Sequence, residues 1–269
     1  MEYVYITISV LIIILGSLSG ILFINKKFEK FFQEKIKYFI AFSAGVFLMT
    51  VFSVTKEVFE LSQNFVYPVL FIASGFLFSV VLNIFIPETH QHHTSKDCQH
   101  TKNKHSAKKV LIGDSIHNIT DGLIIVPAFF ASTYLGAVTV FSIFIHEFIQ
   151  EVSEFFVLKK AGYSSKKALF RNFLTSLTII LGVLIALLIS QNNFLEMSLL
   201  SFSAGIFLNI IFKDLLPELY KKVSKKNLVL YTLILILGFG VLYSVNLLTP
   251  HTHVLEDGQH QNDHDHEHE

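Results

Sequence analysis

The sequence predicts an all-α integral membrane protein with eight transmembrane helices, and three observations lead to this fold class. Hydrophobic residues make up 52% of the 269 residues and charged residues only 16%, whereas soluble domains carry about 25% charged residues. Eight apolar stretches approach the length of about 20 residues that a helix needs to cross a bilayer. Basic residues are concentrated in alternate loops between these stretches. A single Cys and a formal net charge of zero argue against a disulfide-rich scaffold and a basic nucleic-acid-binding protein.

The eight predicted spans are joined by short polar loops, apart from a longer loop after the third span. The second span is the shortest. The first is interpreted as a retained span and not as a signal peptide, because no basic residue precedes its apolar core and lysines follow it. In chain order, the predicted spans cover residues 3–24, 38–54, 65–86, 110–131, 134–158, 168–189, 194–216 and 228–248.

The charge of the loops orients these spans. All but two of the 21 Lys and Arg residues lie in four loops, at residues 26–37, 96–109, 159–171 and 221–226. These loops alternate with loops that carry almost no basic residue. Because positively charged loops remain in the cytoplasm, we expect all four on the cytoplasmic side and both termini on the extracytoplasmic side.

A repeated segment relates the two ends of the predicted bundle. Residues 42–48 read FSAGVFL in the second span, and residues 202–208 read FSAGIFL in the seventh. The loop charges run these two spans in opposite directions, so the repeat is inverted, as it is in many secondary transporters. We expect it to relate spans 1–3 to spans 6–8. The alternative is independent origin, since small residues let helices pack closely in any membrane protein.

The fourth and fifth spans carry acidic residues at membrane depth without a basic residue nearby. No Lys or Arg occurs between Lys109 and Lys159. Ionisable groups inside a bilayer are costly and are normally paired or functional. These acids are therefore either protonated or completed by a cation. They are Asp114, Asp121, Glu147, Glu151 and Glu154.

Helical spacing places the polar residues of each of these two spans on one face. Residues three, four and seven positions apart share a face of an α-helix. The two spans form an antiparallel hairpin, and a rise of about 1.5 Å per residue puts their polar clusters about 20 Å and about 23 Å from its turn. The two faces can therefore meet at similar depth. They carry Asp114, His117, Asn118 and Asp121 on one helix, and His146, Glu147, Gln150, Glu151 and Glu154 on the other.

The chemistry of these residues predicts a metal site. Imidazole, carboxylate and amide groups together suit zinc and other divalent first-row metals, and the lack of a thiolate disfavours copper(I). The alternative is a polar interhelical network without metal. Two histidines and several acids at matching depth favour the metal site, because intramembrane ionisable groups are usually functional.

Three segments of this chain resemble motifs of the ZIP family of zinc and iron transporters. Residues 113–122, GDSIHNITDG, are similar to the family motif HNxxDG. Residues 146–151, HEFIQE, are similar to HExPHE or HExPQE, and DLLPEL at residues 214–219 ends the seventh span as it does in the family. The resemblance covers essentially the whole chain.

The resemblance implies a transport site with one metal position or two adjacent ones. It also implies a homodimer in which spans 1, 4, 5 and 6 move against the rest. Ile149 stands where the family has a proline, and Gln150, a weak neutral ligand, stands where many members have a second histidine. The implied site residues are His117, Asn118, Asp121, His146, Glu147, Gln150 and Glu151.

The remaining eleven histidines fall in two polar segments, five in the loop after the third span and six at the C-terminus. Histidine-rich tracts bind metal loosely without a fold, although such sequence can also be merely solvated. The candidate auxiliary ligands are His90, His92, His93 and Cys98 in the loop, and His264, His266 and His268 in the tail.

These observations together predict a transporter, not an enzyme, that carries a divalent metal ion into the cytoplasm through the site in spans 4 and 5. Zinc is the first candidate, and Fe²⁺, Mn²⁺ and Cd²⁺ suit the same ligands. We expect no organic cofactor and no nucleic-acid partner. One alternative is an intramembrane zinc metalloprotease, but Gln150 replaces the second His of the HExxH motif that such an enzyme needs. Another alternative interpretation is a metal-gated receptor or channel.

The expected domain organisation follows from the spans. Residues 1–249 form one eight-span metal-transport domain, with a cytoplasmic His-rich loop at residues 87–109. Residues 250–269 form an extracytoplasmic tail rich in His and acidic residues. We expect the protein to reside in the lipid bilayer of the plasma membrane, that is, the inner membrane of the cell.

Overall fold

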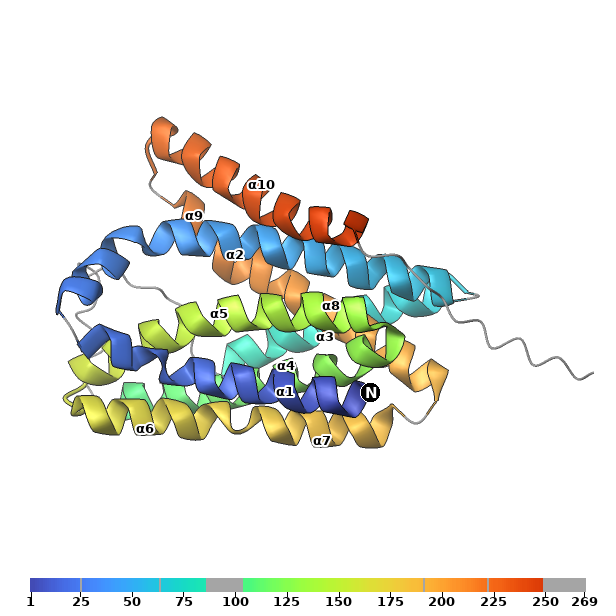
Figure 1. Cartoon of the computed structure of the whole chain (residues 1–269), viewed down its shortest axis with the longest axis horizontal. Coiled ribbons are helices and arrows are strands. Elements are labelled where there is room, and N and C mark those ends of the chain that lie inside the picture. Colours follow the sequence, from blue (N-terminus) through green and yellow to red (C-terminus); the bar gives the residue numbers. More distant parts are fainter. Residues whose placement is uncertain (25, 63, 86–103, 191, 222, 249–269) are drawn as a thin grey trace, which may run out of the picture.

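The computed structural model describes residues 1–24, 26–62, 64–85, 104–190, 192–221 and 223–248. Long helices lie side by side along the molecule (Figure 1), and no strand occurs within these ranges. In chain order the elements are α1 (Glu2–Gly16), η1 (Ser17–Ile24), α2 (Lys26–Leu61), α3 (Val66–Phe85), α4 (Lys104–Ala131), α5 (Thr133–Lys160), α6 (Ser165–Ser176), α7 (Ile179–Ile189), α8 (Asn193–Asn209), η2 (Ile210–Leu215), α9 (Leu216–Tyr220) and α10 (Lys225–Leu248). Of the two η elements, η1 is a 3₁₀-helix and η2 a π-helix.

The all-helical prediction is confirmed in the described residues, whereas the number of spans stays a prediction. Six segments are long and apolar enough to cross a membrane, and they correspond to predicted spans 1, 2, 5, 6, 7 and 8. The predicted third and fourth spans are also helical, as α3 and α4. Helix α3 is apolar over Val66–Leu82, whereas the polar residues of α4 lower the hydropathy of that helix.

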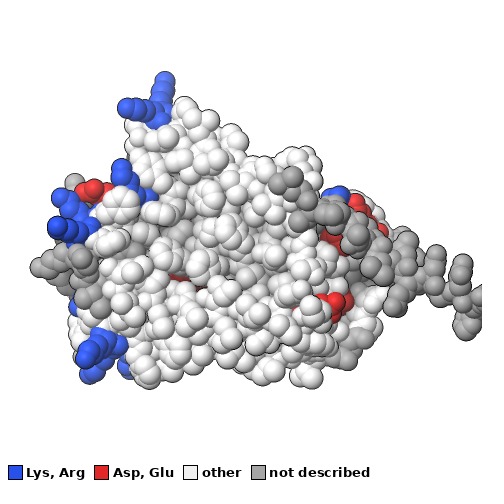
Figure 2. All heavy atoms as spheres, viewed as in Figure 1, with Lys and Arg blue, Asp and Glu red and all other residues white. Residues whose placement is uncertain are grey.

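The basic residues gather at one end of the bundle. Helix α1 runs from the N-terminus to this end, where α2, α6 and α10 begin (Figure 1). Figure 2 shows most of the visible Lys and Arg side chains here, and little charge on the flanks between the two ends. The flanks are apolar because large hydrophobic side chains of α1, α3, α7 and α10 face outward and are exposed. Such a surface suits contact with lipid.

Glycines bring three pairs of helices into direct backbone contact. A Cβ atom on Gly45 of α2 would lie 1.9 Å from the carbonyl oxygen of Leu235 in α10, and one on Gly205 of α8 would lie 2.0 Å from that of Ile72 in α3. Gly122 of α4 meets α7 in the same way, at 2.2 Å from the carbonyl oxygen of Ile179. Because any larger side chain would separate these backbones, glycine is required at the contacts.

This packing predicts that Gly45→Ala lowers the stability of the protein. The added methyl group would overlap the backbone of α10, and overpacking of this kind typically costs about 1–3 kcal/mol or more. Gly240→Ala is the matched control, because no atom lies within 4 Å of its Cβ position and Ala is favoured over Gly in helices by about 1 kcal/mol. Thermal unfolding of both purified variants in detergent measures the difference. Equal midpoints would contradict the packing argument.

Candidate metal centre

A tight turn between α4 and α5 sets the polar faces of these helices against each other. Helix α4 ends at Ala131 and α5 begins at Thr133. Between them, the side-chain oxygen of Ser132 accepts a hydrogen bond from the backbone N–H of Leu135 at 3.1 Å. This N-cap satisfies one of the free N–H groups at the start of α5. The chain therefore reverses within one residue, and the two helices run antiparallel.

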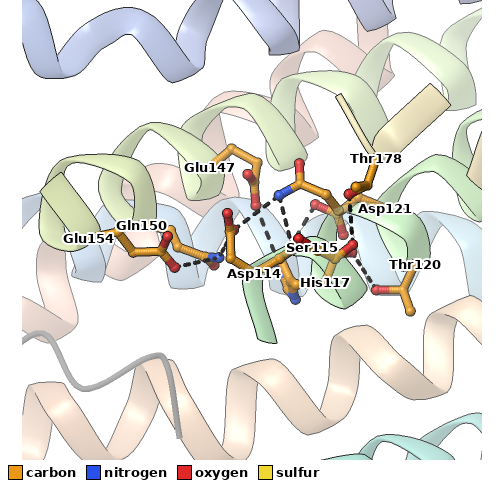
Figure 3. A network of polar contacts seen from close by, with 10 residues as sticks. Asp114, Ser115, His117, Thr120, Asp121, Glu147, Gln150, Glu154 and Thr178 are labelled. Atoms are coloured by element: carbon orange, nitrogen blue, oxygen red, sulfur yellow. Dashed lines mark hydrogen bonds and ion pairs between the residues drawn. The ribbon is translucent and has the colours of Figure 1, made fainter. Parts of the chain in front are cut away.

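The structure gathers all seven sequence-predicted site residues into one buried cluster, and Figure 3 shows His117, Asp121, Glu147 and Gln150 among them. None of them is more than 9% exposed, and the same cluster includes two further acids of the shared helix faces. From α4 come Asp114, His117, Asn118 and Asp121, and from α5 come His146, Glu147, Gln150, Glu151 and Glu154.

One part of the cluster combines two histidines with a carboxylate. His117 Nε2 lies 3.5 Å from Glu147 Oε1 and 3.7 Å from Asp121 Oδ2. The rings of His117 and His146 have centroids 5.3 Å apart. One ligand atom each from His117, His146 and Glu147 lie within 4.8 Å of one another, which is a spacing that one metal ion with nitrogen and oxygen ligands could bridge. We call these three residues the histidine set.

A second part of the cluster contains only carboxylates. One oxygen each from Asp114, Glu147 and Glu151 also lie within 4.8 Å of one another, and we call these residues the carboxylate set. Glu147 belongs to both sets. Among the described residues, no hydrogen bond is made to either carboxylate oxygen of Glu147 or of Glu151, and a 3.5 Å ion-pair contact with His117 reaches Glu147 Oε1. Buried oxygens of this kind are costly unless a cation or a proton completes them.

Two side-chain amides hold Asp114 in place. Asn118 Nδ2 donates to Asp114 Oδ1 at 3.0 Å and to the backbone carbonyl of Asp114 at 3.1 Å. Gln150 Nε2 donates to the same Oδ1 atom at 2.7 Å and to Glu154 Oε1 at 3.4 Å. Gln150 therefore lies inside the cluster, as predicted from its position one turn after His146, but its NH₂ group faces the carboxylates.

Other helices support the cluster from outside. The ring of Phe47 in α2 packs edge-on against His146, with centroids 5.1 Å apart, and against Phe207 of α8, at 4.8 Å. Asn172 Nδ2 of α6 donates to the backbone carbonyl of Glu151 at 2.9 Å. The spacing within α4 and α5 could indicate Asp114 and Glu154, but no sequence pattern indicates which residues of α2, α6 and α8 reach the cluster.

The auxiliary ligands predicted in the polar segments are not placed by the structure. His90, His92, His93 and Cys98 lie in residues 86–103, and His264, His266 and His268 lie in residues 249–269, all outside the described residues.

A buried cluster of His, Asp and Glu between helices of membrane-spanning length defines an integral membrane protein with a candidate intramembrane metal centre. The family model described as ZIP zinc transporter matches residues 88–246, which is more than half of the chain. The chain belongs to the ZIP family, and the family assignment predicted from its sequence motifs is confirmed.

Curated relatives match the chain over about half of its length. Mouse zinc transporter ZIP10 is 36% identical over 128 residues, which are 47% of this chain and 15% of that protein. Zinc transporter zipt-7.1 of Caenorhabditis briggsae is 36% identical over 159 residues, 54% of this chain and 40% of that protein. Human zinc transporter ZIP4 is 34% identical over 112 residues, 42% of this chain and 17% of that protein. The chain thus covers less than half of each of these relatives.

The contact with Phe47 predicts that Phe47→Ala destabilises the protein. Phe47 is fully buried, and truncation of a buried Phe to Ala typically costs about 3–5 kcal/mol. Phe52→Ala is the matched control on the same helix, because the Phe52 side chain is 50% exposed. Chemical unfolding of the two variants in detergent measures the difference. A Phe47→Ala variant no less stable than Phe52→Ala would contradict this packing role.

Proposed function

We propose that this protein transports a divalent metal ion, zinc first among candidates, across the membrane into the cytoplasm through the cluster between α4 and α5. The observation that carries the proposal is the histidine set, in which His117, His146 and Glu147 offer three ligand atoms within 4.8 Å of one another. Two imidazoles and a carboxylate are a ligand set that zinc favours. Relatives of this chain that are named zinc transporters, mouse ZIP10 and human ZIP4, support the same cargo.

The shared carboxylate suggests how an ion advances through the site. Glu147 can hold an ion together with the histidine set and then together with Asp114 and Glu151 of the carboxylate set. An ion that keeps one ligand while it exchanges the others avoids a fully unliganded state in the membrane interior, where charge is most costly. Asn118, Asp121 and Gln150 line the same cluster. Fe²⁺, Mn²⁺ and Cd²⁺ suit these groups as well as zinc does.

We further propose the eight-span architecture, with α3 and α4 as the remaining two spans. At about 1.5 Å per residue, 20 residues of α3 and 28 residues of α4 measure about 30 Å and about 42 Å, enough to cross the hydrocarbon core. The gathering of basic residues at one end supports a cytoplasmic location for that end and an extracytoplasmic one for both termini (Figure 2). Residues 1–249 then form the transport domain and residues 250–269 the tail.

The glycine contacts support the inverted repeat. Gly45 and Gly205 hold the same place in the two FSAG segments, and α2 and α8 run in opposite directions (Figure 1). Gly45 contacts α10, whereas Gly205 contacts α3. The reciprocal contacts agree, since Phe42 of α2 meets Gly238 of α10 and Phe202 of α8 meets Gly75 of α3. This exchange of partners is what a repeat relating spans 1–3 to spans 6–8 predicts.

We also propose a homodimer, which the resemblance to the ZIP family implies, and residence in the plasma membrane. Family membership also favours transport over the alternative of an intramembrane zinc metalloprotease. Gln150 occupies the position of the second histidine of HExxH, and its amide nitrogen is directed at Asp114 and Glu154. A zinc protease needs an imidazole at that position.

The proposed site predicts that His117→Ala and Glu151→Ala each abolish zinc uptake while the protein still reaches the membrane. The first removes a nitrogen ligand of the histidine set, and the second removes a carboxylate of the carboxylate set. Uptake of Zn²⁺, Fe²⁺, Mn²⁺ and Cd²⁺ into proteoliposomes with purified protein measures the effect. Ser115→Ala is the control, because the Ser115 hydroxyl donates to the Leu111 carbonyl of its own helix. Near-normal uptake by either site variant would refute the assignment.

The proposed orientation predicts that Cys98 faces the cytoplasm. Cys98 is the only Cys of the chain. The sequence predicts that it lies in a loop with five Lys residues, which the positive-inside rule assigns to the cytoplasm. A membrane-impermeant maleimide should label Cys98 in permeabilised cells and leave it unlabelled in intact cells. Labelling of intact cells would reverse the orientation, and with it the proposed direction of uptake.

A further inference from the structure

The carboxylates of the cluster continue beyond the two metal-ligand sets, toward the basic end of the bundle. Helix α5 ends with Lys159 and Lys160, and Glu154 lies about 10 Å closer to that end along the helix axis than Glu147 does. On α4, Asp114 lies one turn nearer to the same end than His117. An ion that leaves the carboxylate set for the cytoplasm would therefore next lie between Asp114 and Glu154.

One atom joins these two carboxylates. Gln150 Nε2 lies 2.7 Å from Asp114 Oδ1 and 3.4 Å from Glu154 Oε1, so a single NH₂ group lies between acids of two different helices (Figure 3). A carboxylate accepts hydrogen bonds, and only the nitrogen end of an amide can donate to two such groups. The NH₂ group thus takes the place between two acids where a cation would also be stabilised.

A separate observation indicates that the acids of this region are not fully satisfied by hydrogen bonds. Glu151 is 1% exposed, and both of its carboxylate oxygens lack a hydrogen-bond donor among the described residues. One of them lies within 4.8 Å of an oxygen of Asp114. The second oxygen of Glu154, Oε2, likewise lacks a donor there. More buried oxygen acceptors are present than the amides of Asn118 and Gln150 satisfy.

We propose that Asp114 and Glu154 form an inner position for a divalent cation, and that the Gln150 amide competes with the cation for it. This inference rests on the proposed transport function. An ion moving inward from the carboxylate set displaces the NH₂ group, and the NH₂ group returns to both carboxylates when the ion leaves. Gln150 is then a competitor of the metal at this position and not its ligand.

The competition has a physical consequence for release. Two facing carboxylates without a partner would hold a divalent ion tightly, because the membrane interior offers them no water. The amide supplies hydrogen bonds to charged acceptors, each worth roughly ten- to a hundred-fold in an equilibrium constant. Filling the inner position must therefore replace these hydrogen bonds, which weakens retention and speeds departure of the ion.

Gln150→Met and Gln150→Leu together test the inference, because neither side chain can donate a hydrogen bond and leucine has no sulfur that could itself bind the metal. Zn²⁺ bound by the purified full-length protein is counted by equilibrium dialysis, and initial Zn²⁺ uptake is measured in proteoliposomes. We expect the dissociation constant of the most weakly bound Zn²⁺ ion to be at least about ten-fold lower in Gln150→Met and in Gln150→Leu than in the unsubstituted protein. The maximal uptake rate of both variants should also be lower. Glu154→Gln in the Gln150→Met background should reverse the gain in binding. Ser115→Ala should change neither quantity.

The outcomes separate three interpretations. If Gln150→Met loses Zn²⁺, Gln150 is a ligand and the inference is overturned; unchanged binding and uptake overturn it as well. If the unsubstituted protein neither binds nor transports Zn²⁺ or other divalent ions, the proposed function itself fails. Should Gln150→Met not fold, Gln150→Asn replaces it, because an amide one carbon shorter cannot reach both carboxylates, and the same gain in Zn²⁺ binding is expected.

Discussion

The cost of burying five carboxylates and two imidazoles between α4 and α5 is the constraint on which the rest of the structure depends. Water would stabilise these groups, and the membrane interior does not. The packing around the cluster excludes water and fixes the groups close together. Gly122 brings the backbone of α4 against α7, and Asn172 of α6 donates to the backbone of Glu151. Such neighbours hold acids at distances where a shared cation can offset their repulsion.

The two metal-ligand sets differ in the chemistry of their donors. The histidine set offers two nitrogens and one carboxylate, which suit zinc, whereas the carboxylate set offers oxygen alone and suits harder ions as well as zinc. Under the proposed function, the histidine set would therefore determine which metal the protein selects. On the proposed transport route, the carboxylate set would accept an ion that the histidine set has already selected.

Much of the candidate site follows from the sequence because an α-helix is periodic. Spacings of three, four and seven residues put His117 and Asp121 on one face, and the single residue at the turn, Ser132, fixes that face opposite His146 and Glu147. Hydropathy was less informative for α4, because the same polar face that makes the site lowers its apolar character. A helix wrapped by others can carry polar groups that a lipid-facing helix cannot.

The orientation of side chains and the contacts between distant helices were not predictable in this way. Spacing places Gln150 in the cluster but does not say whether its oxygen or its nitrogen faces inward. The nitrogen faces inward because both neighbours, Asp114 and Glu154, are acceptors. Likewise, no periodic pattern in α2 indicates that Phe47 reaches His146, since that contact depends on how α2 crosses α5.

The FSAG segments link the repeat to the site through aromatic rings. Phe47 and Phe207 hold the same place in the two segments, and they meet each other beside His146. Ring packing is only weakly directional compared with a hydrogen bond or an ion pair. If α4 and α5 move against α2 and α8, as the ZIP resemblance implies, His146 can slide past these rings without breaking a strong directional bond. The apolar contact thus supports the imidazole and would still permit the displacement that the proposed transport requires.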